Sequence, residues 1–183
     1  MDESTIYSIG HGTKKIEDFI EELKSFNILY LLDIRSKPYS KWSPQFNQSE
    51  LNETLKKHDL KYVYVGDLLG GMPEDRSCYD YNGIVIYDRI KEKDFFKEGL
   101  ERLTTANEKK IDVAIMCSES DPAECHRTKL IGQELLKRGI SVKHIISTGR
   151  MKTQEVVMNE LTKGNGTIDL FGNKTEFKSR KSH

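Results

Sequence analysis

The sequence predicts a doubly wound, three-layer α/β domain with a mainly parallel central sheet of about five strands. Nearly continuous apolar runs rich in Ile, Val, Tyr and Leu recur along the chain, and such runs are typical of parallel strands buried on both faces. Segments with helical period lie between the runs, and this alternation implies right-handed crossovers. The length of 183 residues suits one domain.

Five apolar runs are expected to form the strands: residues 6–9, 29–34, 62–65, 113–117 and 142–146. Ligands of doubly wound sheets bind outside the carboxyl ends of the strands, where the strand order reverses. We expect the first strand in the middle of the sheet, flanked by the strand that ends at Asp33 and the strand that ends at Cys117.

Helices are expected between the strands. The first apolar series has the spacing of an amphipathic helix, with Thr13 placed to cap it, and consists of Ile16, Phe19, Ile20, Leu23 and Phe26. Three more helices are marked by Leu51 and Leu55, by Phe96, Leu100 and Leu103, and by Leu130, Ile131, Leu135 and Leu136, the last ending at Gly139. Residues 83–90 fit a strand or a helix, and we assign them to the helix that follows.

The chain is expected to divide into a Rossmann-like α/β domain at residues 1–150 and a C-terminal helix with a polar, basic tail at residues 151–183, appended to the same domain. Val156, Val157 and Leu161 indicate the helix. From Lys174 on, four basic residues stand against one Glu, and we expect this tail to be frayed.

Composition narrows the class of protein. Hydrophobic residues make up 36% and charged residues 32%, with no apolar run long enough to span a membrane. Lys plus Arg equals Asp plus Glu, 29 against 29, so any anion site must be local. The start of the chain has no leader pattern, which favours a cytoplasmic location. Three cysteines form no disulfide framework, and we expect free thiols.

The candidate site begins at residues 10–13, Gly-His-Gly-Thr, which follow the first strand. Small residues and free N–H groups at a helix N-terminus favour an anion, so Gly10 is a candidate ligand-binding residue and His11 a candidate proton carrier. A tight turn explains the glycines nearly as well. The segment lacks the dinucleotide fingerprint and the P-loop lysine.

Asp33 and Arg35 lie two residues apart at a strand end, so their side chains are expected on one face. They pair with each other in the simplest interpretation, and in the alternative Arg35 clamps a carboxylate or phosphate. The next loop interleaves basic and aromatic residues, which suits a lid that stacks Trp42 on a flat ring or aromatic side chains that anchor the loop. Gly70 and Gly71, after the third strand, are assigned to the same site.

The segment after the fourth strand carries the densest group of reactive side chains. A helix is expected to begin at residue 122 or 123 with Asp121 as its cap, which gathers its first N–H groups, His126 and Arg127 around one pocket. Glu119 and His126 are candidate general acids or bases, and Arg127 is a candidate phosphate clamp.

Cys117 and Cys125 are candidate ligand-binding residues of this pocket. With His126 they have the types of metal ligands, but their spacing lacks the usual close pair and a fourth ligand, so we assign no metal. Cys117 is placed like the nucleophile of thiol phosphatases and sulfurtransferases. Their short loop before an Arg is absent, because Arg127 lies ten positions on, and a half-buried structural cysteine is the simpler interpretation.

Several motifs occur in order over residues 6–146: Ile-Gly-His, Asp-Ile-Arg followed by Ser and Pro, Pro-Gln-Phe, Leu-Gly-Gly, Cys-x-Glu and Cys-His-Arg. Their order resembles the domain-of-unknown-function family 488. The resemblance implies a Rossmann-like α/β domain of intracellular, mostly prokaryotic proteins, and it leaves the reaction open. Its motif positions correspond here to Gly10, His11, Asp33, Arg35, Pro38, Leu69, Gly70, Gly71, Cys117, Glu119, Cys125, His126 and Arg127. Gly12 stands where many members carry Ser, which removes one hydroxyl ligand.

These observations predict a protein that binds a small anionic, phosphate-containing or nucleotide-like ligand at the carboxyl edge of the sheet. We expect an enzyme, a hydrolase or transferase, with His11, Glu119 and His126 as proton carriers. Nucleic acid is another partner of suitable chemistry, and no membrane partner is expected. A non-catalytic module that senses or docks an anion is the alternative, and a Cys/His metal or thiol-redox protein is a third. The sequence names no cofactor.

Overall fold

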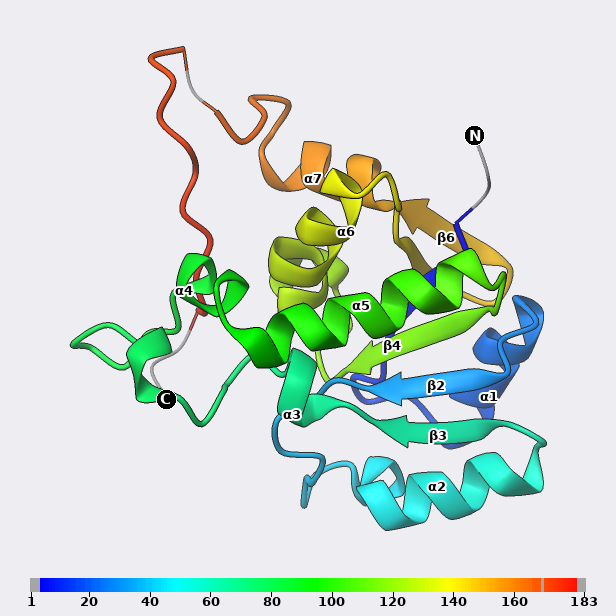
Figure 1. Ribbon diagram of the computed structural model, residues 1–183. Helices are drawn as coiled ribbons and strands as arrows, with labels where there is room; N and C mark the ends of the chain where they lie inside the picture. The colour runs from blue at the N-terminus through cyan, green and yellow to red at the C-terminus, as the bar shows by residue number, and fades with distance from the viewer. Residues whose placement is uncertain (1–3, 169, 181–183) are drawn as a thin grey trace.

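Six strands form one sheet in the order β3-β2-β4-β1-β5-β6 (Figure 1) in the computed structural model, which describes residues 4–168 and 170–180. The first five strands are parallel, and β6 pairs antiparallel with β5. Their bounds are β1 Ile6–Gly10, β2 Tyr30–Asp33, β3 Lys61–Tyr64, β4 Val113–Cys117, β5 Lys143–Ser147 and β6 Arg150–Thr153. The predicted α/β class and mainly parallel sheet are confirmed, with one antiparallel strand added.

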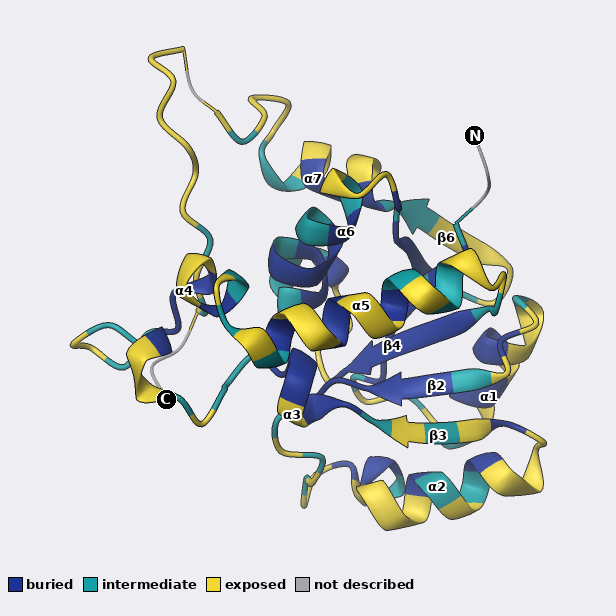
Figure 2. Ribbon diagram, viewed as in Figure 1, coloured by how far each residue is buried: buried dark blue, intermediate teal, exposed yellow. Residues whose placement is uncertain are grey.

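The predicted order of the strands was wrong in one respect. β1 does lie beside β4, but β4 separates it from β2, and the backbone N–H of Ile34 donates to the carbonyl of Met116 at 3.1 Å. All five residues of β4 are buried, whereas β3 at the sheet edge is partly exposed (Figure 2). The most apolar strand therefore takes a central place. This order also differs from the 3-2-1-4-5-6 order of the usual Rossmann fold.

Helices cover both faces of the sheet (Figure 1). One face carries α1 (Ile16–Ser25), the 3₁₀ turn η1 (Pro44–Phe46) and α2 (Gln48–Lys57), and the other carries α3 (Gly66–Leu69), α5 (Asp94–Glu108), the π-helical turn η4 (Arg127–Gly132) and α6 (Gln133–Lys137). Successive strand residues point to opposite faces, so Met116 packs with Phe19 on one side and Ile115 packs with Phe96 on the other. The four helices expected from apolar periodicity are present.

Two of the predicted helix starts need correction. Asp121 is a cap, as predicted, and accepts from the N–H of Ala123 at 2.9 Å, but it caps only the short 3₁₀ turn η3 (Pro122–Glu124). Cys125 is extended, so the helical segment begins at Arg127 and not at residue 122 or 123. The prediction that Thr13 caps α1 was wrong, because Lys15 is the N-cap residue and makes no side-chain cap bond. The chain first completes a turn in which the N–H of Lys14 donates to the carbonyl of His11, and the helix starts only after it.

The expectation of a frayed tail is contradicted up to Arg180, while residues 181–183 lie outside the described residues. Lys178 forms a bridge with Ile86, and the N–H of Ser179 donates to the carbonyl of Val85 at 3.0 Å. After α7 (Gln154–Leu161) the chain thus returns to the segment before α4 (Tyr87–Lys91) (Figure 1). This pairing also explains why only the second half of the ambiguous segment 83–90 is helical.

None of the helices in the described part of the chain combines the length and apolar character that crossing a bilayer requires.

Candidate functional site

A cavity of about 180 Å³ lies at the carboxyl ends of β2 and β4. Five chain segments form its walls: the residues after β2, the loop after α3, the start of α4 at Tyr87, the stretch from the end of β4 to η4, and the C-terminal tail. The position is the one expected for a ligand site of an open parallel sheet. Half of the predicted site residues line it, namely Arg35, Gly71, Cys117, Glu119, Cys125 and His126. Gly10, His11, Asp33, Trp42, Gly70 and Arg127 are not among its lining residues.

Arg35 is fixed at the wall of the cavity by Asp33. Its Nε and NH2 groups donate to the two carboxylate oxygens of Asp33 at 2.9 and 2.6 Å, and NH2 also donates to the carbonyl of Phe46 at 2.7 Å. Tyr62 donates its hydroxyl proton to the same carboxylate at 2.7 Å. Both partners of the ion pair are buried, at 6% and 0% exposure. The guanidinium is therefore rigid, and its charge is already matched.

His11 supports the guanidinium of Arg35. Its Nδ1 lies 2.9 Å from the carbonyl of Gly12 and its Nε2 lies 3.2 Å from NH1 of Arg35. A carbonyl only accepts, so Nδ1 carries the proton and Nε2 accepts from Arg35. Burial lowers the pKa of His11 to about 4, and its ring stacks on Phe46 with centroids 4.5 Å apart. With both nitrogens engaged, His11 positions Arg35.

In the loop after β1, neither the backbone N–H of His11 nor that of Gly12 is free to bind an anion. They donate to the carbonyls of Cys117 and Ser118, each at 3.0 Å, which extends the pairing of β1 with β4. Gly10 is required for close approach: a Cβ atom there would lie 1.9 Å from the carbonyl oxygen of Glu119. Gly10 thus serves backbone packing.

Replacing Gly10 with alanine is expected to lower the free energy of unfolding by about 1–3 kcal/mol, because the loop that carries Glu119 must move. Chemical denaturation measures the change. Thr13→Ala, an exposed change in the same loop, is the control and should shift stability by less than about 0.5 kcal/mol. A Gly10→Ala protein as stable as the wild type would contradict this account of the close contact.

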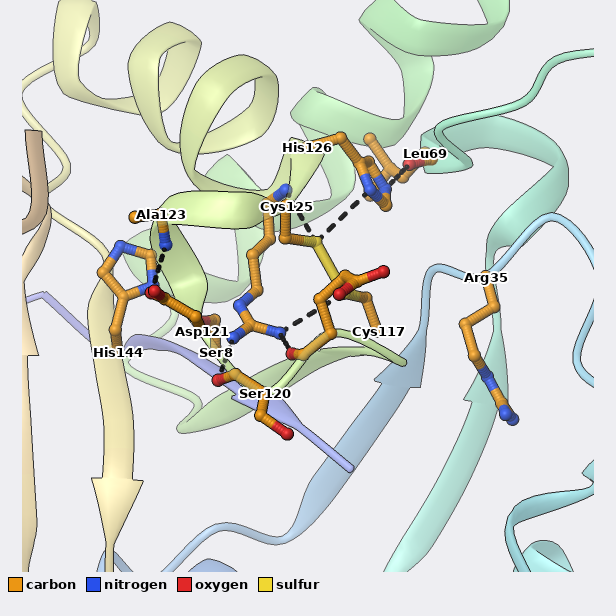
Figure 3. The surroundings of a disulfide bond; sticks show 12 residues. Ser8, Arg35, Leu69, Cys117, Ser120, Asp121, Ala123, Cys125, His126 and His144 are labelled. Atoms are coloured by element: carbon orange, nitrogen blue, oxygen red, sulfur yellow. Dashed lines mark hydrogen bonds between the residues drawn. A yellow bond between two sulfur atoms is a disulfide. The ribbon is translucent and has the colours of Figure 1, made fainter. Parts of the chain in front are cut away.

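Cys117 and Cys125 form a disulfide (Figure 3), and both residues line the cavity. The expectation of free thiols is therefore wrong for these two, whereas Cys78 is free and buried. Spacing along the chain did not reveal the pair, because the 3₁₀ turn capped by Asp121 folds the intervening loop back on itself.

His126 lies beside the disulfide. Its Nε2 is 3.0 Å from the carbonyl of Leu69, and its Nδ1 is 3.5 Å from Cys125 Sγ (Figure 3). Burial lowers the pKa of His126 to about 4. Among the described residues, the two sulfurs and a nitrogen of His126 are also the one group that could hold a metal ion, with ligand atoms within 4.8 Å of one another. A metal would need both sulfurs as thiolates, so metal binding and the disulfide exclude each other.

Arg127 is the largest fully buried side chain in the described part of the chain. Its NH1 group donates to the carbonyl of Glu119 at 2.7 Å and its NH2 group donates to that of Ser120 at 3.0 Å. It holds the loop between β4 and η4 from inside the protein. These contacts direct the guanidinium of Arg127 to the loop and not to a ligand in the cavity.

Arg180 lies at the mouth of the cavity and was not predicted as a site residue. It forms ion pairs with Glu119, at 3.2 Å, and with Glu124. Sequence reasoning assigned the tail to solvent because its charge run has no apolar period. The apolar residues 84–86 were the signal that the tail has a pairing partner.

Other lining residues were missed as site residues for similar reasons. Lys37 belongs to the basic and aromatic loop after β2, and Ser36 bonds the opposite wall by accepting from the N–H of Met72 at 2.9 Å. Trp42 lies in the same loop but is 84% exposed, with Lys41 Nζ 5.0 Å from its ring centroid. The remaining lining residues that were not predicted are Tyr87, Ser118, Glu124 and Ser179.

The comparisons with known proteins identify the family alone. No curated protein and no solved structure gives a significant match to the chain. The family described as Domain of unknown function DUF488 matches residues 15–133, which include β2, β4, Arg35, Cys117 and Arg127. The match covers more than half of the 183 residues. The chain therefore belongs to the DUF488 family.

Proposed function

We propose that the cavity binds a small anionic ligand that contains phosphate. The observation that supports this best is the meeting of three cationic side chains, Arg35, Lys37 and Arg180, from the residues after β2 and from the tail. Guanidinium and ammonium groups are the usual partners of phosphate oxygens. The family match leaves the ligand open, so the proposal depends on this geometry.

The three cations differ in their freedom to bind. Arg35 is held by Asp33, so it offers a fixed donor with little net charge. Lys37 is exposed, and Arg180 pairs with Glu119 and Glu124 at the mouth of the cavity. These surface pairs are weak in water. A phosphate group can therefore exchange with the two carboxylates for the guanidinium of Arg180.

Glu119 is the proton carrier in this proposal, and the reaction class is hydrolysis or transfer on a phosphorylated or nucleotide-like substrate. Its carboxylate lines the cavity and is partly exposed. His126 also lines it, but its Nε2 is bound to Leu69, so Nδ1 alone can exchange a proton. A carboxylate and a neutral imidazole beside an anion site are groups suited to acid–base catalysis.

We propose the cytoplasm as the location.

The test is a titration by calorimetry of inorganic phosphate, AMP and ATP into the wild-type protein and into Lys37→Ala, Arg180→Ala and the double variant. We expect each single variant to weaken phosphate binding about tenfold, because one charge-assisted hydrogen bond to phosphate is lost. Arg138→Ala is the matched control, since Arg138 is also an exposed arginine in an ion pair, with Glu101 at 2.7 Å. Equal losses in Arg138→Ala, or no binding of any probe by the wild type, would sink the proposal.

Two comparisons separate the remaining functions. Turnover of a bound probe that is lost in Glu119→Gln supports an enzyme, whereas binding without turnover supports the sensing or docking module. Trp42→Ala should weaken ATP and short single-stranded oligonucleotides more than inorganic phosphate if the exposed ring stacks on a base. Equal affinities in wild type and Trp42→Ala would remove the ring from the site.

A further inference from the structure

A buried cation is in contact with a sulfur atom below the cavity. The Arg127 side chain is 1% exposed, and its NH1 group donates to Cys117 Sγ at 3.3 Å. Its Nε has no hydrogen-bond partner. In the ranges 4–168 and 170–180, no carboxylate forms an ion pair with this guanidinium. Among the described residues, the guanidinium therefore has no carboxylate in contact, and the charges of Asp121 and Glu119 act on it only from a distance.

A negative charge on Cys117 would supply a contacting anion. Burial lowers the pKa of Arg127 to about 10, so the guanidinium stays charged at neutral pH. A buried charge without a counter-charge is strongly unfavourable. When the disulfide is reduced, Arg127 favours the thiolate form of Cys117, because an adjacent cation stabilises the charged form of an acid.

We propose that Cys117 and Cys125 are a redox-active pair that exchanges electrons with low-molecular-weight disulfides, with Cys117 as the attacking thiolate and Cys125 as the resolving thiol. The disulfide in the structure is the oxidised form of the pair. The proposal needs no bound anion, so it goes beyond the function proposed above and stands or falls separately.

The surroundings of Cys125 suit a resolving thiol. The carbonyl of Leu69 only accepts, so His126 carries its proton on Nε2 and its Nδ1 is an acceptor. This nitrogen lies 3.5 Å from Cys125 Sγ and can accept the thiol proton. Cys125 thus remains a protonated, hydrogen-bonded thiol while Cys117 is held as the thiolate.

Small molecules can reach the pair through the cavity, and the two cysteines are close together in the sequence. Both cysteines line the cavity, although they are 4% and 3% exposed. They are eight positions apart, so the bond closes a short loop, and a disulfide that closes a short loop constrains the unfolded chain less than a long-range one. These features are expected of a pair that opens and closes at one site.

The reaction balances with a disulfide as the oxidant. The Cys117 thiolate attacks one sulfur of the small disulfide, a mixed disulfide forms, and the first small thiolate leaves. Cys125 then loses its proton and attacks Cys117 Sγ, which forms the internal disulfide and releases the second small thiolate. The protein loses two electrons and the small disulfide gains them.

The test measures thiol reactivity in the reduced protein. After reduction and removal of the reductant, iodoacetamide alkylation of each cysteine is followed by mass spectrometry as a function of pH. We expect Cys117 to be alkylated about tenfold faster at pH 7 than a thiol with the ordinary pKa of about 8.5. The alkylation rate of Cys117 should reach half of its maximum at a pH below about 8.5. Arg127→Lys should keep most of this rate, and Arg127→Gln should lose it.

Oxidation supplies the second readout, with oxidised glutathione as the probe. The wild type should lose two thiols and retain no adduct, whereas Cys125→Ser should trap one glutathione on Cys117. Cys78→Ser is the matched control, because Cys78 is outside the cavity, and it should behave as the wild type. Failure to form the internal disulfide, or an ordinary pH profile for Cys117 in the folded wild type, would overturn the proposal. Stoichiometric binding of zinc by the reduced protein that blocks oxidation would replace it with a metal site.

Discussion

Replacing Asp33 with alanine is expected to lower the free energy of unfolding by about 3–5 kcal/mol, the usual cost of leaving a buried charge without its partner. Arg35 is 6% exposed, and Asp33 accepts two hydrogen bonds from its guanidinium, one from its backbone N–H and a fourth from the hydroxyl of Tyr62. Without the carboxylate, the guanidinium keeps only the carbonyl of Phe46 and the ring of His11. Urea denaturation at pH 7 gives the change.

Two further variants test whether the unpaired charge is the cause. Asp33→Ala combined with Arg35→Met removes both charges and should recover much of the lost stability. Glu101→Ala removes the partner of Arg138 in an exposed ion pair and should cost less than about 1 kcal/mol. Equal effects of Asp33→Ala and Glu101→Ala would show that burial of the pair has no role.

Acidification is expected to destabilise the protein through its buried histidines. Burial lowers the pKa of His11 and of His144 to about 4, from the ordinary value of 6.5. Both side chains are almost fully buried, at 4% and 0% exposure. Below about pH 6.5 these histidines are protonated in the unfolded chain, but in the folded protein they stay neutral down to about pH 4. The free energy of unfolding therefore decreases as the pH falls from about 6.5 to about 4.

The expected size is about 2 kcal/mol for each of the two histidines between pH 7 and pH 5, a range in which most carboxylates remain ionised. Together they amount to about 4 kcal/mol, a large part of the stability of a small domain, which is about 5–15 kcal/mol. His126 adds to the effect, because burial lowers its pKa to about 4 as well. Urea denaturation at several pH values measures the slope.

Variants of single histidines identify the source of the slope. His144→Gln removes a ring that bonds Ser8 at 2.6 Å and Gln154 at 2.8 Å, so the protein should be less stable at pH 7 but should lose less on acidification. His58→Gln, at the exposed C-cap of α2, should leave the slope unchanged. A stability that is flat from pH 7 to pH 5 would contradict this account.

Local patterns predicted the elements, and long-range contacts decided what the patterns left open. The spacing of Phe96, Leu100 and Leu103 is enough to predict α5, because an amphipathic helix needs only neighbouring residues. The place of β4 between β1 and β2 depends on which apolar strand gains most from a central position, and a strand sequence does not state its neighbours. The docking of the tail on Val85 and Ile86 also involves residues about 90 positions apart.

The same difference between local patterns and long-range contacts applies to the candidate site. Four of the polar residues expected after strands, Arg35, Cys117, Glu119 and His126, line one cavity. The spacing of ten residues between Cys117 and Arg127 argued against the short loop of thiol phosphatases and sulfurtransferases, yet the folded loop brings the guanidinium to the sulfur. Chain distance predicts spatial distance only where the conformation of the intervening residues is known, and a loop with a 3₁₀ turn gives no periodic signal.

The central place of β4 has a consequence for the order of folding. β1 and β2 do not pair with each other in this sheet, because both use β4 as their neighbour. The segment from β2 to β3 can pair early and locally, but the two halves of the sheet join only when residues 113–117 have been inserted between them. During synthesis, the facing edges of β1 and β2 stay open until that strand has left the ribosome, and they are the surfaces that a chaperone would have to cover.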